Sequence, residues 1–250
     1  MIKNKIYFAS DFHLGVPTHE DSLKREKVIV NWLESIKEDA KSIYLLGDIF
    51  DFWFEYKTVV PKGFVRLLGK LAQLTDSGIK IHIIKGNHDM WMYDYLPKEV
   101  GLSIVEDKII LEENGKKIFL AHGDGLGPGD IGYKLIKKVF TSTICQWLFA
   151  RIHPNFGIGV AQFWSQKSRI ANQENPEIFL GEEKEWLVSY CKKKQEISPV
   201  DYYVFGHRHL PLEIDIDAAS KYINLGDWIH HHSYGVFDGE TLILKYFRKN

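Results

Sequence analysis

Short apolar runs alternate with stretches of helical period in the N-terminal part of the chain, and this alternation predicts β/α units. Lys5–Ser10 and Ser42–Leu46 are apolar runs of strand length, and Asp21–Lys37 between them repeats apolar positions with the period of a helix. A second helical pattern, Phe64–Leu74, precedes another strand-like run at Lys80–Ile84. We therefore expect parallel β-α-β units in this part of the chain.

The remainder of the chain predicts strands on either side of a long helical stretch. Asn114-Gly115 accepts the positive φ angles of a tight hairpin turn between two apolar runs. Tyr133–Ile170 is mainly helical in pattern, with breaks expected at Pro154 and at Gly157-Ile158-Gly159, and a further helix is expected near Glu182–Lys194. The strands are expected at Lys108–Leu111, Lys117–Ala121, Tyr202–Phe205, Leu212–Ile216, Tyr222–Leu225, Tyr234–Phe237 and Leu242–Tyr246.

Parallel units at the front of the chain and antiparallel strands at the back predict an α/β fold. We expect two mixed β-sheets packed face to face, with helices on the outside. Residues 1–130 and 174–250 would form the core, and residues 131–173 a helical insertion that caps it.

Composition and charge narrow the class of protein. With 45% hydrophobic and 26% charged residues, the chain can bury a sizeable core, and its net charge of −1 disfavours a general nucleic-acid binder. The predicted insertion differs, because it has no Asp or Glu between Ile131 and Gln173 and therefore suits a different partner from the rest of the chain. Its basic residues are Lys134, Lys137, Lys138, Arg151, Lys167 and Arg169.

Cysteine usage and apolar run lengths indicate a cytoplasmic protein. Cys145 and Cys191 lie far apart without a CxxC arrangement, so neither a disulfide framework nor a thiolate zinc site is expected. The residues from Met1 to Asp11 show no signal-peptide pattern, and no apolar run reaches the length of a membrane-spanning helix.

Five polar clusters each follow a predicted strand and carry the candidate chemistry. The carboxyl ends of strands line the ligand crevice in α/β sheets, so five separate segments would bring their side chains together. Carboxylate, amide and imidazole groups are ligands for Mn²⁺, Fe²⁺ or Zn²⁺, which predicts a two-metal hydrolytic centre. The clusters are Asp11-Phe12-His13, Gly47-Asp48-Ile49-Phe50-Asp51, Gly86-Asn87-His88-Asp89, His122-Gly123-Asp124 and Gly206-His207-Arg208-His209.

Local spacing supports this grouping. Asp11 with His13, and His207 with His209, are two residues apart, and such residues point the same way on an extended backbone. Any one Asp or His at the end of a strand is usually a turn residue, so the prediction depends on the joint pattern. Glycine precedes three of the candidate ligands, where we expect the backbone to turn tightly against the metals: Gly47, Gly86 and Gly206.

The ordered motifs DFH, GDIFD, GNHD, HGD and GHRH resemble those of the calcineurin-like metallophosphoesterases. The resemblance implies the four-layer fold of that family and two divalent metals bridged by Asp48. It implies that one metal is held by Asp11, His13, Asp48 and His209, and the other by Asp48, Asn87, His122 and His207.

The resemblance also implies a mechanism. Paired metals lower the pKa of a shared water, so a bridging hydroxide would attack the phosphorus. His88 would be a catalytic histidine outside the ligand set, polarised by Asp89, and would stabilise charge or donate a proton to the leaving group. Asp51 is expected to orient a ligand rather than to bind metal.

A closer resemblance appears outside the metal motifs. The run His122–Tyr133, the helical insertion and Leu225-Gly226-Asp227-Trp228 are similar to the UDP-2,3-diacylglucosamine pyrophosphatases of lipid A biosynthesis. This implies hydrolysis of the nucleotide sugar to UMP and 2,3-diacylglucosamine 1-phosphate (lipid X), with Mn²⁺ as the usual metal. The enzyme would be peripheral at the cytoplasmic face of the inner membrane of a Gram-negative bacterium. Implied substrate contacts are Asn87, Asp130, Tyr133 and Lys167.

The sequence departs from that family at two places. His88 stands where many members have Arg, and residues 163–167 replace much of an arginine-rich run. The insertion nevertheless combines basic residues with apolar ones, as acyl chains and a diphosphate would require, although the same apolar residues could simply pack onto the core. The apolar residues are Phe140, Ile144, Trp147, Leu148, Phe149, Phe156, Phe163 and Trp164.

Other interpretations remain open at this stage. The chain could hydrolyse a soluble nucleotide or a phosphoprotein, or it could be an inactive phosphate-binding scaffold that keeps the fold. One of His230, His231 and His232 could reach the phosphate or nucleotide, or all three could belong to a solvent-facing loop.

Overall fold

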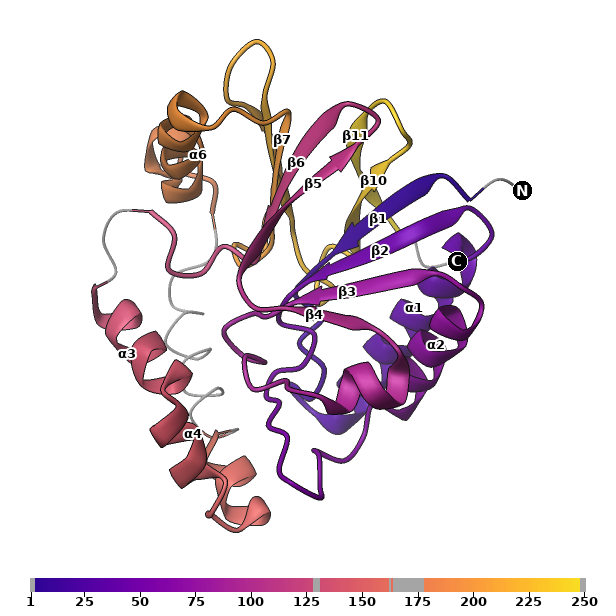
Figure 1. The fold of residues 1–250 in the computed structure, drawn as a ribbon, viewed down its shortest axis with the longest axis vertical. Coiled ribbons are helices and arrows are strands. Elements are labelled where there is room, and N and C mark those ends of the chain that lie inside the picture. The colour runs from indigo at the N-terminus through magenta and orange to yellow at the C-terminus, as the bar shows by residue number, and fades with distance from the viewer. Residues whose placement is uncertain (1–2, 128–130, 162, 164–177, 248–250) are drawn as a thin grey trace.

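The computed structural model describes residues 3–127, 131–161, 163 and 178–247. Its first sheet has six strands in the order β11-β10-β1-β2-β3-β4 (Figure 1). β1 to β4 pair in parallel, and β10 and β11 add antiparallel strands at one edge. The strands are β1 (Lys5–Ala9), β2 (Ala40–Leu46), β3 (Lys80–Ile84), β4 (Ser103–Val105), β10 (Ser233–Phe237) and β11 (Leu242–Tyr246).

The second sheet has five strands in the order β5-β6-β7-β9-β8. The expectation of antiparallel strands at the back of the chain is wrong for its centre, because β6, β7 and β9 pair in parallel. The connection from β6 to β7 contains helices, and a long connection of this kind lets the chain re-enter the sheet in the same direction. The strands are β5 (Lys108–Glu113), β6 (Lys116–Ala121), β7 (Tyr202–Phe205), β8 (Pro211–Asp215) and β9 (Lys221–Leu225).

Alternating side chains on the strands build a four-layer arrangement. On β1, Ile6 and Phe8 face the second sheet, whereas Tyr7 and Ala9 face the helices on the other side. The outer layers are α1 (His19–Ile36) and α2 (Val65–Asp76) on the first sheet and α6 (Trp186–Ile197) on the second. Figure 1 shows the two sheets between these helices, so the expected pair of mixed sheets with flanking helices is confirmed.

Helix α2 begins without a side-chain cap of its own. Glu26 of α1 supplies one, because its carboxylate accepts hydrogen bonds from the backbone N–H groups of Arg66 and Leu67 at 2.9 and 3.0 Å. The Glu26 side chain is buried, so this contact ties the two helices of one layer together.

The described part of the insertion is helical. It comprises α3 (Ile131–Thr141), α4 (Thr143–Phe149) and a third helical stretch over residues 154–161. Pro154 begins the third stretch, where the missing N–H costs nothing, so the break expected there is confirmed. Residues 164–177 lie outside the described part of the chain, and the division into core and insertion stays a prediction.

The break expected at Gly157-Ile158-Gly159 is wrong, because residues 154–161 are continuously helical. A Cβ atom on Gly157 would lie 2.8 Å from the hydroxyl oxygen of Tyr56 and 3.2 Å from the Phe149 ring. The glycine therefore permits close packing of this helical stretch, which offsets its low helix propensity.

Two short elements were not predicted. These are β4 at the edge of the first sheet and η1 (Leu96–Val100), a single turn of π-helix. A short helix, η2 (Glu182–Lys184), precedes α6, and a tight turn at Asn114-Gly115 joins β5 to β6. That turn has positive φ angles at both residues, so the expected hairpin is confirmed.

Candidate metal centre

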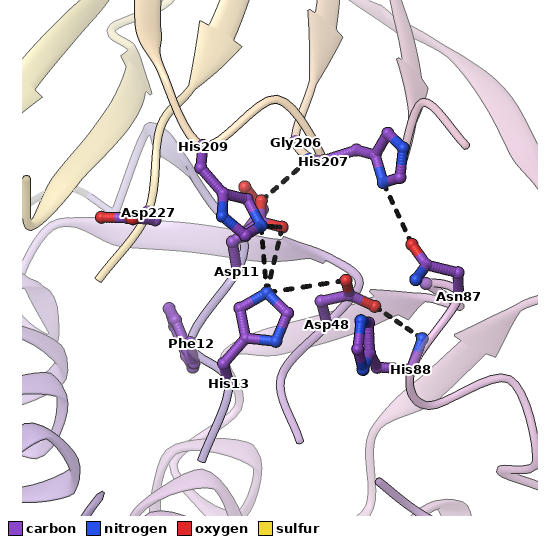
Figure 2. Close-up of polar contacts among 12 residues, drawn as sticks. Asp11, Phe12, His13, Asp48, Asn87, His88, Gly206, His207, His209 and Asp227 are labelled. Carbon is purple, nitrogen blue, oxygen red and sulfur yellow. Dashed lines mark hydrogen bonds and ion pairs between the residues drawn. The ribbon is translucent and has the colours of Figure 1, made fainter. Parts of the chain in front are cut away.

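The five polar clusters converge at the carboxyl ends of β1, β2, β3, β6 and β7. Figure 2 shows the side chains of four of these clusters, among them Asp11, Asp48, Asn87 and His207, pointing toward one another from separate strands. Three groups of potential metal-binding atoms form there, each with its atoms within 4.8 Å of one another. Two of them contain Asp48, and the other consists of His13, Asp51 and His88. The first group is Asp11, His13, Asp48 and His209, and the second is Asp48, His122 and His207.

In the first group, the nitrogen and oxygen atoms that could bind a metal lie close enough together to surround one cation. His13 Nε2 lies 3.1 Å from His209 Nε2 and 3.6 Å from Asp48 Oδ2, and His209 Nε2 lies 3.2 Å from Asp11 Oδ1. Asp11 Oδ1 is buried and accepts no hydrogen bond. A buried carboxylate oxygen without a donor is costly, and a divalent cation between these atoms would satisfy it. The donor set fits a metal that prefers oxygen and imidazole.

In the second group, Asn87 supplies the atom that links the two imidazoles. Its side-chain oxygen lies 3.1 Å from His122 Nε2 and 3.0 Å from His207 Nδ1. His122 Nε2 also lies 3.4 Å from Asp48 Oδ2, the oxygen that faces His13 in the first group. The Asp48 carboxylate therefore stands between both groups, as a bridging ligand would.

The backbone at these residues is left-handed. Asp11, His13, Asp48, His207 and His209 all have positive φ angles, between 44° and 66°. The paired ligands were expected to converge because residues two apart point the same way on an extended backbone. The pairs do converge, but the backbone there is left-handed and not extended, so the expected reason is wrong. Non-glycine residues seldom adopt this conformation, and strain of this kind gathers at functional sites.

Glycines next to the ligands allow the segments to approach closely. A Cβ atom on Gly86 would lie 2.2 Å from Asp48 Oδ1, and one on Gly206 would lie 2.5 Å from Asp11 Oδ2. A Cβ on Gly47 would lie 2.6 Å from the Gly86 backbone. The tight approach expected at the three glycines is confirmed.

Contacts behind two of the histidines indicate which nitrogen faces the centre. His122 Nδ1 lies 2.7 Å from the backbone oxygen of Leu46, and since a carbonyl only accepts, Nδ1 carries the proton and Nε2 is available as a ligand. His13 Nδ1 lies 3.4 Å from Asp51 Oδ1. Asp51 is thus placed to orient His13 from behind, as the sequence predicted.

The positions of His88 and Asp89 differ from the expectation that Asp89 polarises the His88 ring. His88 Nδ1 lies 3.0 Å from the backbone oxygen of Asp51, and the His88 backbone N–H donates to Asp48 Oδ1 at 2.9 Å. Asp89 is fully buried, and both of its oxygens accept hydrogen bonds from backbone N–H groups between 2.7 and 3.3 Å away. The donors are Gly86, Asp48, Ile49 and Phe50. The carboxylate of Asp89 therefore organises the loops that carry the ligands.

The titrating groups of the centre perturb one another. Burial would raise the pKa of Asp11, but the imidazoles of His209 and His13 outweigh burial and lower it. Burial would also raise the pKa of Asp48, but the charge of His122 outweighs burial and lowers it. Burial would lower the pKa of His122, but the charge of Asp48 outweighs burial and raises it. Carboxylates held ionised in this way are the form that binds metal.

The pKa values of His207 and Asp89 are also shifted. Burial and the nearby charge of His122 lower the pKa of His207 to about 4, which keeps that imidazole neutral and able to ligate. Burial and the charge of Asp48 raise the pKa of Asp89 to about 6. A cation on Asp48 would oppose this second effect, because it would neutralise the charge that disfavours ionised Asp89.

Two ion pairs brace the ligand loops from outside. Arg208, between the two histidines of GHRH, donates to the buried carboxylate of Glu185 at 2.8 and 3.0 Å. Lys137 of α3 donates to Asp124 at 2.6 Å, which ties the insertion to the loop after β6. Sequence reasoning missed Glu185, because nothing in its local pattern points to a partner 23 residues away.

Three of the four predicted substrate contacts cannot be placed. Asp130 and Lys167 lie outside the described residues, and for Tyr133 only the backbone is described, at the start of α3. Asn87 lies in the centre itself. The placement of the remaining three stays a prediction.

The three consecutive histidines belong to a turn built on Asp227. The buried Asp227 carboxylate accepts hydrogen bonds from the backbone N–H groups of His230 and His231, and it lies 3.2 Å from His231 Nδ1. The His232 ring packs against Trp228 with centroids 5.9 Å apart. These contacts favour the structural interpretation of His230, His231 and His232 over a role at the phosphate.

An aromatic cluster packs the insertion against the core, in addition to the contact of Lys137 with Asp124. Phe149 packs against Phe54 and Trp91 with ring centroids 4.8 and 4.9 Å apart, and Trp91 Nε1 donates to the backbone oxygen of Phe140 at 2.7 Å. These rings therefore serve partly as ordinary packing, which was one of the two interpretations left open.

Many other apolar side chains of the insertion face solvent. The exposed fraction is 70% for Ile144, 56% for Trp147 and 67% for Phe156. Contiguous exposed apolar surface marks a site of contact with another molecule or a membrane. Among the described residues, no helix combines the length and the apolar character needed to cross a membrane. Further exposed apolar side chains of this surface are Leu135, Val139, Leu148, Val160 and Phe163.

Comparison with known proteins agrees with the geometry. A family model described as calcineurin-like phosphoesterase matches residues 4–211. The UDP-2,3-diacylglucosamine hydrolase of Porphyromonas gingivalis (strain ATCC BAA-308 / W83) is 40% identical over 256 residues, covering 98% of each chain. That of Vibrio parahaemolyticus serotype O3:K6 is 26% identical over 230 residues, covering 88% of this chain and 89% of that protein. Among solved structures, Yfce, a phosphoesterase from E. coli, is 17% identical with a TM-score of 0.46, covering 95% of this chain and 90% of that one.

Proposed function

Because the chain belongs to the calcineurin-like phosphoesterase family, we propose that it hydrolyses the pyrophosphate bond of UDP-2,3-diacylglucosamine. The products are UMP and 2,3-diacylglucosamine 1-phosphate, an intermediate of lipid A. The observation that carries the reaction type is the pair of buried ligand groups that share Asp48. The observation that carries the substrate is the 40% identity, over nearly the whole chain, to a protein described as a UDP-2,3-diacylglucosamine hydrolase.

The ligand roles follow the two groups. Asp11, His13 and His209 would hold one divalent cation, and Asn87, His122 and His207 would hold the other, with Asp48 available to both. Two such cations would supply an activated water and charge stabilisation for the phosphate under attack. The proposed metal is Mn²⁺, because a centre of carboxylate, amide and imidazole without thiolate suits it, although the same donors accept Fe²⁺, Zn²⁺ or Mg²⁺.

His88 is the proposed catalytic side chain outside the ligand set. Its Nδ1 is engaged by the Asp51 backbone oxygen, which leaves Nε2 for a phosphoryl oxygen, and 22% of its side chain is accessible to solvent. The leaving group here is a phosphate monoester, which is stable as an anion, so charge stabilisation serves the reaction as well as proton donation would. Asp89 supports the site by holding the loops of Asp48 and Asn87 in place.

The exposed apolar surface of α3, α4 and residues 154–161 is the proposed site for the acyl chains and for contact with the inner membrane. Its side chains include Ile144, Trp147 and Phe156, and Arg151 lies over the Trp147 ring with 3.6 Å from its guanidinium carbon to the centroid. A basic group beside exposed aromatic rings suits a surface that carries anionic headgroups. We accordingly place the protein at the cytoplasmic face of that membrane.

The decisive experiment measures UMP release from UDP-2,3-diacylglucosamine with Mn²⁺, beside UDP-glucose and 2′,3′-cyclic nucleotides as soluble alternatives. We expect turnover of the lipid substrate, loss of turnover with a chelator, and recovery when Mn²⁺ is restored. Asp48→Asn, which keeps the size of the side chain, should abolish both Mn²⁺ binding and turnover. A clear preference for the soluble substrates would refute the lipid assignment, and undiminished hydrolysis by Asp48→Asn would refute the two-metal centre.

A further inference from the structure

A small cavity of mixed polar and apolar lining lies beside the metal centre, between the turn after β3 and the junction of α3 with α4. Its volume is about 280 Å³. Lys85, Gly86 and Tyr93 contribute from the core, and Lys137, Thr143 and Gln146 from the insertion. The cavity adjoins the centre on two sides. Gly86 directly precedes the ligand Asn87, and Lys137 is bonded to the loop that begins with the ligand His122.

Charge in this cavity is already compensated. Lys85 pairs with Glu106 at 2.8 Å, and Lys137 pairs with Asp124 at 2.6 Å. A second phosphate would therefore gain little from these lysines, because each would first have to leave its carboxylate. The lining is mixed, because Thr143 and Gln146 lie in it together with Met90 and Tyr93. An acyl chain would leave the polar groups without water or hydrogen-bond partners. The cavity therefore suits a neutral group that has both apolar faces and polar edges.

The size of the cavity points to a fragment of a larger substrate. Pockets that hold a whole drug-sized ligand measure about 300–1,000 Å³, so this cavity is at the small end. A diacylated nucleotide sugar would reach it with only one of its polar parts. The candidates are the nucleoside and the glucosamine.

The hydrogen-bonding groups of the cavity favour a nucleobase. Thr143 and Gln146 are three residues apart on α4, so they lie on the same face of that helix. Gln146 Nε2 donates to the backbone oxygen of Phe140 at 3.0 Å. This bond occupies the amide nitrogen and leaves the acceptor Oε1 of Gln146 available to a ligand. The partly exposed ring of Tyr93 and the side chain of Met90 supply an apolar wall for a flat group.

We propose that this cavity binds the uracil of the nucleotide half of the substrate, with Gln146 as the specificity-determining residue and Thr143 as a further contact. The N3–H of uracil would donate to Gln146 Oε1, and its O4 would accept from the Thr143 hydroxyl. Cytosine carries an acceptor at N3, which mismatches Gln146 Oε1, whereas its C4 amino group can donate to the Thr143 hydroxyl, because a hydroxyl accepts as well as donates. The inference rests on the proposed function, because it takes a uridine nucleotide as the substrate.

Binding of UMP and CMP to the Mn²⁺-loaded protein, measured by titration calorimetry, tests the assignment without requiring turnover. We expect the intact protein to bind UMP about three- to tenfold more tightly than CMP, since one neutral hydrogen bond is worth about that factor. Gln146→Leu should bring the two affinities closer by about the same factor, whereas Thr143→Val should weaken UMP and CMP alike. Ser142→Ala is the matched control, because this neighbouring hydroxyl makes no cap hydrogen bond and does not line the cavity.

The ratio of the two affinities separates recognition from structural damage. Loss of the Gln146 bond to Phe140 could loosen the α3–α4 junction, but that would weaken UMP and CMP alike and leave their ratio unchanged. Equal affinities in the intact protein, or an unchanged ratio in Gln146→Leu, would overturn the assignment. Failure of the proposed function would show separately, as absence of UMP release from the lipid substrate.

Discussion

Replacement of Asp89 by asparagine should destabilise the fold, and the hydrogen bonds of the residue set the size of the effect. Oδ1 accepts from the N–H groups of Gly86 and Asp48, and Oδ2 accepts from those of Ile49 and Phe50. Whichever oxygen becomes NH₂, two buried donors lose their acceptor, at about 1–3 kcal/mol each. The expected loss is therefore about 2–6 kcal/mol. For a chain of 250 residues, even the lower figure lowers Tm by about 4–8 °C.

The same substitution should weaken metal binding, because two of the four donors belong to ligand loops. Asp48 is the shared ligand, and Gly86 precedes the ligand Asn87. Loss of a supporting contact behind a metal site typically costs about 10–100-fold in metal affinity. His88→Gln provides the comparison, since glutamine can still donate to the Asp51 backbone oxygen that the His88 ring contacts at 3.0 Å, and the ring otherwise packs edge-on against the ligand His13. That variant should keep its Mn²⁺ affinity and Tm and lose kcat by about 10²–10⁴.

Scanning calorimetry and Mn²⁺ titration on the two variants separate the possible roles of Asp89. If Asp89 organises the loops, Asp89→Asn lowers Tm and Mn²⁺ affinity, and high Mn²⁺ restores part of its turnover. If Asp89 acts by polarising His88, Asp89→Asn behaves like His88→Gln, with unchanged Tm and Mn²⁺ affinity and a reduced kcat that no Mn²⁺ concentration restores. The second pattern would refute the role derived from the structure.

Three further predictions concern other parts of the molecule. Gly206→Ala should abolish Mn²⁺ binding in calorimetry, because its Cβ would lie 2.5 Å from a ligand carboxylate, whereas Gly159→Ala has open space and should leave binding unchanged. A thiol reagent should label Cys145 in the native protein and spare Cys191 until denaturant is added, since Cys191 is fully buried and burial raises its pKa; labelling of both at equal rates would contradict this. Glu26→Ala should cost about 1–2 kcal/mol in denaturant unfolding by uncapping α2, and an unchanged midpoint would exclude the cap.

Much of the fold was predictable, because most of its strands are apolar runs bounded by polar turns. Two elements went unpredicted because they are too short to show a period. β4 spans only Ser103–Val105, and η1 spans only Leu96–Val100. The parallel pairing of β7 with β9 depends on how distant segments fold back, and local pattern carries no information about it.

The sequence predicted which residues form the candidate site, but it did not predict what each of the supporting residues does there. Strand ends identified all seven expected ligands, which the structure brings together. The role of Asp89 was not predictable, because its partners at Asp48, Ile49 and Phe50 lie about 40 residues away in sequence. The same holds for Glu185 and Arg208, whose buried pair has no local signature. Contacts between loops decide such roles, and one sequence does not record them.

The left-handed backbone at the ligands explains how side chains of neighbouring residues can point to the same metal centre. A residue of strand conformation at Asp11 would continue β1 and send alternate side chains to opposite faces of the sheet. The positive φ at Asp11 and at His13 ends the strand and turns both side chains to the centre, at a cost of about 1–3 kcal/mol for each such residue. Backbone hydrogen bonds hold this arrangement, since Asp11 donates to the Gly47 oxygen at 3.1 Å and His13 donates to the Asp48 oxygen at 2.9 Å. The two ligand loops therefore stabilise each other, and a change in either one should be felt at both metal positions.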